Sequence, residues 1–377
     1  MDLNEFRKSF PIFDRLTYVN SCSQGALATS VRQATESWLQ SWDQYGSPWE
    51  TWIQDYEQLR VRFAEMIGAK PAEVAVVYSA STGINSVASA LNYRERPKIV
   101  MADFDFPTVG HVWLAQERAG AKVEFVRSRD GQVKIEDYEK LIDNQTSVVS
   151  ITQISYRTGF RSDVKTITDL AHRKGALVLL DCFQDAGTRP IDVKSLGVDM
   201  LVTGTLKYML GPSGVGFLYV QEGLIDLLTP RQSGWFAQTN PFSFNTDKLD
   251  IADTANRFQS GTPPIPSCYA AKAGIELLCN AGLNNIEDRV RTVSQRFLSG
   301  ARNLGIKAVT PDDSVGPLVV LKSRDIETLL GRFSDRGIVA STRDGNLRVS
   351  FHGYNTEDDA DKVLAALKDN RELMVLE

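Results

Sequence analysis

The sequence has few residues that could cross-link a chain, bind a metal or anchor the protein in a membrane. Only four cysteines and three histidines occur among its 377 residues, and no pair of cysteines has the Cys-x-x-Cys spacing. We therefore expect neither a disulfide framework nor a metal site. No apolar run approaches the roughly 20 residues of a membrane span, and the acidic, polar N-terminus does not resemble a signal peptide. These features predict a cytoplasmic protein that binds no membrane.

Charge and composition exclude further classes. The net charge is −5 with both signs interspersed and no basic tail, so we expect no nucleic-acid partner. No Gly-x-Gly-x-x-Gly turn follows the first predicted strand, which argues against a dinucleotide-binding fold. With 42% hydrophobic and 24% charged residues, the composition is that of a globular protein. A chain of this length is expected to form one large and one smaller domain.

The first two thirds of the chain alternate between predicted strands and helices. Short runs rich in Val, Ile and Leu are the predicted strands: Val74–Tyr78, Lys98–Ala102, Lys122–Val126, Ser147–Ile151, Ala176–Asp181, Met200–Thr203 and Gly216–Val220. Amphipathic stretches before or between them are the predicted helices: Tyr56–Ile67, Pro107–Ala119, Ile135–Ile142 and Asp163–Lys174. Such alternation predicts an α/β fold with a mainly parallel sheet covered on both faces.

The pattern changes near residue 265. The remaining predicted elements are the helices Ala270–Cys279, Asp288–Asn303 and Thr356–Lys368 and the strands Leu318–Lys322 and Leu347–Phe351. We therefore predict a large domain over residues 15–264 and a small α+β domain over 265–377. The N-terminal segment, residues 1–14, is expected to join the small domain.

Polar and aromatic residues follow the predicted strands, where sites of such sheets gather. Ser79–Gly83 is a turn of small residues before a helix, which either holds an anion such as phosphate or only caps the helix. Two aromatic residues, Phe104 and Phe106, follow the next strand. Both could be core residues, but their alternation predicts that at least one lies beside the crevice at the strand ends.

Two charged residues end later strands in apolar surroundings. Asp181 ends a buried strand, so it either caps the next turn or faces a cation, for which a protonated pyridine nitrogen is one candidate. Lys207 follows the next strand among apolar and small residues. Because a dry pocket lowers the pKa of a lysine, this position suits Schiff-base chemistry better than an ordinary surface lysine does.

An arginine lies within a predicted strand of the small domain. Arg348 stands between Leu347 and Val349, and its planar guanidinium suits a carboxylate. Either a substrate carboxylate or a structural salt bridge would account for it.

Together these motifs resemble the class V aminotransferase family of fold-type I enzymes that use pyridoxal 5′-phosphate (PLP), from about Tyr18 to Leu367. The family includes cysteine desulfurases, kynureninases, isopenicillin-N-epimerase-like proteins and C–S lyases. The resemblance implies that Lys207 is the catalytic lysine that holds PLP as a Schiff base. It assigns the other roles as follows: Asp181 to the pyridine nitrogen, Gln184 to the cofactor phenolate, Ser81, Thr82 and Thr205 to the phosphate, and Arg348 to the substrate carboxylate. In Arg257-Phe-Gln-Ser-Gly-Thr262, the threonine would reach the cofactor phosphate of a neighbouring subunit, which implies a homodimer with shared active sites.

Departures from the family's motifs narrow the reaction. Leu206 stands where desulfurases have a histidine, and Ser341–Gly345 is short and has no nucleophilic cysteine. The stretches Phe104–Thr108 and Ser155–Gly159 look more like the kynureninase and epimerase branch, in which the Phe before the Pro, here Phe106, stacks on the PLP ring. Kynureninases, however, have His at the position of Gln184.

We therefore expect an enzyme that removes the Cα proton of an L-amino acid and carries out β-elimination, as C–S lyases do. An aminotransferase, an epimerase, a kynureninase-like hydrolase and a silent PLP-binding homologue stay open as alternatives. His111, on a predicted helix, is a candidate substrate-binding residue. The sequence does not identify the amino acid or assign roles to Trp49, Trp52 and the Ser21–Gly25 turn.

Overall fold

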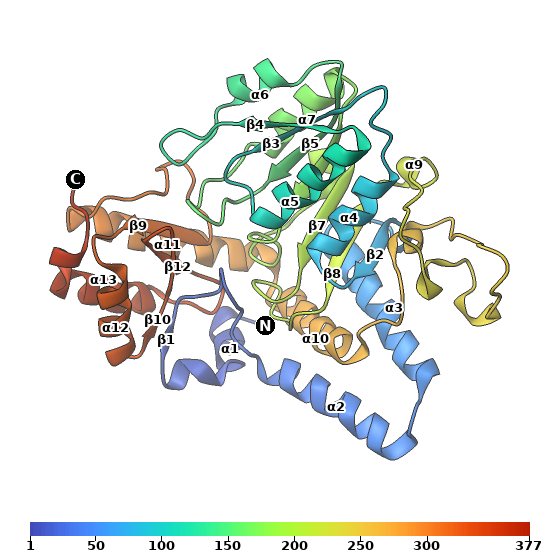
Figure 1. Cartoon of the computed structure of the whole chain (residues 1–377). Helices are drawn as coiled ribbons and strands as arrows, with labels where there is room; N and C mark the ends of the chain where they lie inside the picture. The colour runs from blue at the N-terminus through green and yellow to red at the C-terminus, as the bar shows by residue number, and fades with distance from the viewer.

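A seven-stranded sheet forms the centre of the computed structural model, which describes residues 1–377 (Figure 1). The strand order is β2-β8-β7-β6-β5-β3-β4, and only β8 runs against its neighbours. The strands are β2 (Val74–Val77), β3 (Lys98–Ala102), β4 (Lys122–Val126), β5 (Thr146–Thr152), β6 (Leu177–Asp181), β7 (Met200–Gly204) and β8 (Gly216–Val220). The predicted α/β fold with a mainly parallel sheet is confirmed.

Helices cover both faces of this sheet, because its strands are apolar on both sides. Leu179 belongs to the core on one face and Leu180 to the core on the other. The first of these faces packs on α4 (Ala80–Ala90) and α5 (Pro107–Ala115). The opposite core includes residues from α3 (Trp49–Met66), α6 (Ile135–Leu141), α7 (Val164–Arg173) and α10 (Ile265–Ala281).

The C-terminal part has its own antiparallel sheet and core. Its strand order is β11-β12-β9, built from β9 (Leu318–Lys322), β11 (Ser341–Arg343) and β12 (Asn346–Ser350). Side chains from α11 (Leu283–Asn303), α12 (Ile326–Asp335) and α13 (Glu357–Asp369) complete the core. Figure 1 shows this part in orange and red beside the central sheet.

The N-terminal residues connect the two parts. β1 (Thr17–Tyr18) pairs in parallel with β10 (Ile338–Val339), and Arg7 Nη1 lies 2.7 Å from the carboxylate of Asp359. The amide of Gly25 donates to the carbonyl of Leu206 (2.8 Å), just before Lys207. The chain therefore crosses from the small sheet to the loop that carries the candidate lysine.

Short elements complete the fold. The other helices are α1 (Leu3–Lys8), α2 (Thr29–Tyr45), α8 (Val193–Leu196) and α9 (Glu222–Ile225). Turns of 3-10 helix lie at Pro11–Asp14, Pro71–Glu73, Gln116–Ala119, Trp235–Ala237, Pro241–Ser243, Ala255–Phe258 and Arg371–Leu373. None of the helices combines the length and the apolar character that crossing a membrane requires.

The predicted strands agree with the structure to within one or two residues, whereas several helices and the short strands β10 and β11 differ. α3 begins at Trp49, seven residues before the predicted start, and α2 was not predicted. In α2 only Val31 is buried, so its sequence has no apolar stripe. The helix is held instead by packing on α10 (Figure 1). The division of the chain at residue 265 stays a prediction.

Candidate active site

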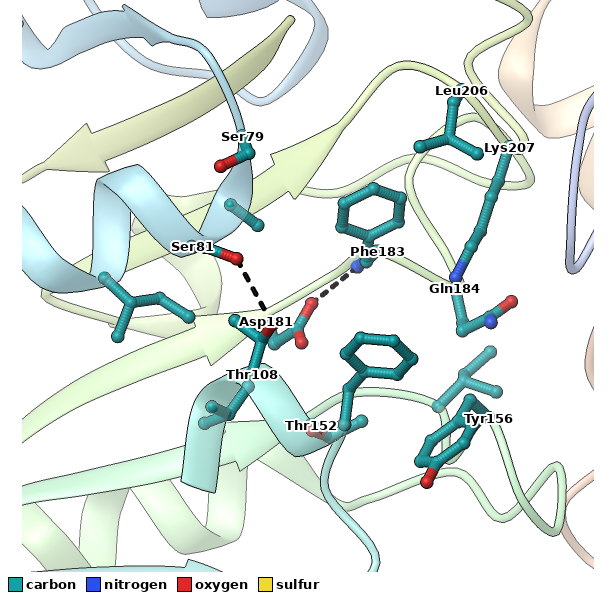
Figure 2. A pocket seen from close by; sticks show the side chains of 15 residues that line it. Ser79, Ser81, Thr108, Thr152, Tyr156, Asp181, Phe183, Gln184, Leu206 and Lys207 are labelled. Atoms are coloured by element: carbon teal, nitrogen blue, oxygen red, sulfur yellow. Dashed lines mark hydrogen bonds between the residues drawn. The ribbon is translucent and has the colours of Figure 1, made fainter. Parts of the chain in front are cut away.

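A cavity of about 360 Å³ lies at the sheet edge where the carboxyl ends of the parallel strands meet. It is lined by Ser79, Ala80, Ser81, Ile84, Phe106, Thr108, Val109, Thr152, Ile154, Tyr156, Asp181, Phe183, Gln184, Leu206 and Lys207 (Figure 2). These residues follow or end β2, β3, β5, β6 and β7. The strand-end location expected from the sequence is therefore where the structure has its cavity.

One side of the cavity is formed by hydroxyl groups at the start of α4; we call Ser79, Ser81 and Thr108 the serine side. Ser79 caps α4, and its Oγ accepts from the amide of Thr82 (3.2 Å). Ser81 Oγ donates to Thr108 Oγ1 (3.2 Å; Figure 2). The partial positive charge at the start of a helix, together with these hydroxyls, suits a phosphate.

Asp181 provides a buried negative charge at the end of β6. One carboxylate oxygen accepts from the amide of Phe183 (2.8 Å), and no lysine or arginine forms an ion pair with the carboxylate. Burial raises the pKa of Asp181, although the Phe183 amide and the charge of Lys207 act in the opposite direction. A cation in the cavity would favour the ionised carboxylate.

Lys207 places its amine in the same cavity, one turn past β7. Nζ makes no hydrogen bond or ion pair; it lies 4.6 Å from the ring centre of Phe183 and 5.6 Å from that of Phe106. Burial lowers the pKa of Lys207 to about 8, and the nearby charges of Arg348 and Arg343 act in the same direction. A large fraction of this amine is therefore neutral near physiological pH, as Schiff-base chemistry requires.

Gln184 joins the cavity to the N-terminal turn. Its Nε2 donates to the carbonyl of Cys22 (3.1 Å), whereas its buried Oε1 has no partner. In Figure 2 the amide lies next to the amine of Lys207. An acceptor left unpaired in a buried site indicates a missing donor.

Aromatic rings give the cavity its apolar lining. Of the two phenylalanines after β3, Phe104 is buried against Phe160, whereas Phe106 lines the cavity and packs edge to face on Tyr156 (5.0 Å between centres). The expectation that at least one of them lies beside the crevice is thus met by Phe106. Phe183 lies over Gly204, where a Cβ atom would clash with its ring.

Arg348 comes from β12 of the small sheet; we call Tyr156, Arg343 and Arg348 the hairpin side. Arg348 is 3% exposed, donates to the carbonyl of Tyr156 and to Ser23 Oγ (3.1 Å each), and has no partner at Nε. It makes no ion pair, so the structural salt bridge considered for it is absent. A guanidinium with free donors remains available to a carboxylate.

Four residues singled out by the sequence do not line the cavity. The Thr205 hydroxyl donates to the carbonyl of Pro212 (2.7 Å), because the Gly-Pro turn folds back over it. Thr82 uses its amide on the cap of its own helix. His111 is exposed on α5, and exposed Thr262 accepts at its carbonyl from the Tyr78 hydroxyl (2.8 Å). The roles predicted for these residues stay predictions.

The structure also adds lining residues that the sequence did not single out. Thr152, Ile154 and Tyr156 end or follow β5, and Thr108 and Phe183 each follow a predicted residue closely. The rule that sites gather at strand ends pointed to these positions. Their side chains are of types common in cores, so nothing in the sequence separated them from core residues.

These residues fit PLP, with a serine side for its phosphate, a buried carboxylate for its pyridine nitrogen and an unpaired amine for its carbonyl. The unpaired Gln184 Oε1 and the two phenylalanine rings fit the rest of a flat polar ring. Lys207, Asp181, Gln184, Ser81 and Phe106 are the residues that would hold it.

Comparisons with known proteins agree with the site. The family model "Aminotransferase class-V" matches residues 45–363. The chain is 36% identical to the "Uncharacterized aminotransferase YcbU" of Bacillus subtilis over 94% of each protein, and 27% identical to a kynureninase of Pseudomonas fluorescens over 91% of this chain and 85% of that one.

A solved structure of C-DES, with glycine linked covalently to its PLP cofactor, matches the fold with a TM-score of 0.90 at 21% identity, over 96% of this chain and 99% of that one. A further C-DES structure, described as a cystine C–S lyase with its product cysteine persulfide, has a TM-score of 0.89 at 21% identity, with the same coverage. At this identity the match concerns the fold. The family match over most of the chain and the cavity together show that this protein is a PLP-dependent enzyme of the class-V aminotransferase family.

Proposed function

We propose that the protein removes the Cα proton of an L-amino acid and then eliminates a β-substituent, in the manner of a C–S lyase. The observation that carries this proposal is the free amine of Lys207, which lies in one cavity with the buried carboxylate of Asp181. PLP, when bound, supplies an electron sink for charge that develops at Cα. Lys207 Nζ then takes the Cα proton as a general base.

The remaining residues bind and orient. Asp181 keeps a positive charge at its carboxylate, Gln184 donates or accepts beside it, and the serine side binds phosphate. Arg348 binds the substrate α-carboxylate through the donors it leaves free. A substrate clamped between Arg348 and Lys207 presents its Cα–H bond to the amine, which is the geometry that proton removal needs.

The turn between β11 and β12 favours elimination over sulfur transfer to the protein. Arg343 pairs with Asn346, so only Asp344 and Gly345 form the turn, both with positive φ (52° and 74°). This is the geometry of a tight hairpin, and it leaves no room for a mobile loop with a cysteine. In the proposed reaction the Cα proton moves to Lys207, and the electron pair of the Cβ–S bond leaves with sulfur. Hydrolysis of the remaining enamine gives pyruvate and ammonia.

A second candidate is transamination, because the relative at 36% identity is named an aminotransferase. Its early step is the same removal of the Cα proton. The two reactions differ in where the proton returns, which the cavity residues do not determine.

Product analysis separates the candidates. Purified holoenzyme is mixed with a panel of L-amino acids, including S-substituted cysteines, in deuterated buffer. Pyruvate, ammonia and a thiol support the proposal, whereas pyridoxamine phosphate indicates transamination. Cα deuteration alone indicates epimerisation, alanine from kynurenine indicates a hydrolase, and no product from any substrate indicates a silent homologue.

We also propose a homodimer with shared active sites. Thr262 is exposed and lies outside the cavity of its own chain, as expected of a residue that reaches a partner's cofactor phosphate. Sedimentation analysis tests the dimer, and Thr262→Val tests the role, since it should weaken PLP binding while the dimer persists. A monomeric holoenzyme with full activity would contradict this proposal.

Location in the cytoplasm stays a prediction from the composition. All four cysteines are unpaired, and three of them are buried. Cell fractionation with an antibody against the protein is the direct test.

A further inference from the structure

The hairpin side carries a second arginine on the same face as Arg348. In the β11–β12 pairing, Ser341 lies opposite Arg348 and Arg343 lies opposite Asn346. Because side chains alternate along a strand, Arg343 and Arg348 project from the same face of the hairpin. They are diagonal neighbours on adjacent strands.

Both arginines contact the same cavity residue. Arg348 donates to the carbonyl of Tyr156, and the guanidinium carbon of Arg343 lies 5.6 Å from the centre of the Tyr156 ring. Tyr156 lines the cavity on the side of Lys207 and Gln184, far from Ser79 and Ser81 (Figure 2). Arg343 is thus at the mouth of the half of the cavity that does not hold the phosphate.

Arg343 makes no ion pair, although a carboxylate is adjacent in sequence. Asp344 is bound instead by Arg157, whose Nε lies 2.7 Å from Asp344 Oδ2. The charge of Arg343 reaches the interior, since with Arg348 it contributes to the lowered pKa of Lys207. Asp181 is the only acid among the lining residues and lies across the cavity from Tyr156 (Figure 2).

We propose that Arg343 binds a second carboxylate on the substrate, so that the enzyme acts on amino acids with an anionic side chain or leaving group. The α-carboxylate satisfies Arg348, which rests on the proposed function above. A neutral side chain would leave the second guanidinium without an anion. An acidic side chain of suitable length satisfies both arginines and removes their mutual repulsion.

A pair of substrates with the same shape and different charge tests this proposal. S-carboxymethyl-L-cysteine and S-carbamoylmethyl-L-cysteine differ only in an acid and its amide, as do aspartate and asparagine. Binding to the holoenzyme is measured by rapid-scan titration of the PLP absorption band, which needs no turnover. We expect the acid to bind about tenfold tighter than its amide in at least one pair, since a charge-assisted hydrogen bond is about twice as strong as a neutral one.

Two variants identify the arginine responsible. Arg343→Gln should bring the acid and its amide within about twofold of each other and leave the affinity for the amide unchanged. Arg343→Lys should keep part of the preference. Arg127→Gln is the matched control, because Arg127 also lies over an aromatic ring, 5.3 Å from the centre of Phe125, but outside the cavity.

Three outcomes would overturn the proposal. Wild type could bind acid and amide equally, Arg343→Gln could weaken both alike as for an α-carboxylate ligand, or Arg127→Gln could remove the preference as well. Because the readout is binding, these outcomes differ from a failure of the proposed reaction. A finding of transamination in place of elimination would leave the acid preference intact.

Discussion

The serine side and the hairpin side of the cavity are built differently. The serine side comes from two adjacent strand-to-helix connections of one sheet, and its hydroxyls bond to each other. The hairpin side joins β12, the connection after β5 and the N-terminal turn, and its arginines keep free donors. The first is a finished binding surface for one constant group, whereas the second is open to whichever substrate supplies the anions.

Lys207 stands between the two sides, and its removal should have the largest effect. Lys207→Ala should lower the rate of Cα-proton exchange by about 10²–10⁴-fold, because the general base is lost. The covalent link to PLP, seen as a visible band that borohydride bleaches, should also disappear. Circular dichroism controls for folding. An alanine variant that still exchanges the proton at the wild-type rate would assign the base to another residue.

The pH dependence of PLP attachment should report the same lysine. Covalent attachment needs the neutral amine, and burial lowers the pKa of Lys207 to about 8 from 10.5. The rate of attachment to apoprotein should therefore rise with pH and level off above about 8. Stopped-flow absorbance measures this rate. A midpoint near 10.5 would mean that the cavity does not perturb the amine.

Arg348→Gln should affect the hairpin side alone. Hydrogen bonds to charged groups are worth about 1.5–3 kcal/mol, so substrate affinity should fall by about ten- to 150-fold. The dissociation constant for PLP should not change, which equilibrium dialysis measures. A loss of PLP affinity in this variant would show that the two sides are not independent.

Gly204→Ala should disturb the wall at Phe183. The added Cβ would overlap the Phe183 ring, which is expected to cost about 1–3 kcal/mol of unfolding free energy. Combining it with Phe183→Ala should recover most of the loss that Gly204→Ala causes, because the clash then has no partner. Urea unfolding of the single and double variants gives the coupling. Additive losses in the double variant would refute the contact.

Ser81→Ala should produce the smallest effect, confined to the serine side. One hydroxyl contributes about 0.5–1.5 kcal/mol, so PLP should bind about two- to tenfold more weakly. Substrate affinity of the PLP-saturated enzyme should stay unchanged. Thr205→Val is the companion variant: its hydroxyl faces the Pro212 carbonyl, so a similar loss of PLP affinity there would place it at the phosphate after all.

The sequence predicted the serine side better than the hairpin side, and the reason is physical. Ser81, Asp181 and Lys207 follow strands of one parallel sheet, so the strand pattern alone places them at one edge. Arg348 was predicted as a carboxylate ligand, but its contact with Ser23 depends on how distant segments pack. Phe183 looked like a core residue, and only the space over Gly204 brings it into the cavity.

The same limit explains the missed elements. α2 is stabilised by packing on α10 rather than by an apolar stripe of its own. Thr205 has the residue type of a phosphate ligand, but the turn at Pro212 captures its hydroxyl. In both cases a contact with another part of the chain overrides what the local sequence favours.

The hydrogen bond between Arg348 and Ser23 joins residues 325 positions apart, and this fixes the order in which the site can form during synthesis. A ribosome releases the serine side, Asp181 and Lys207 well before β12 has been made. Ser23 then waits for almost the whole chain before its partner emerges. A nascent chain can thus have the residues for the cofactor long before it can select a substrate, and only the released protein has both.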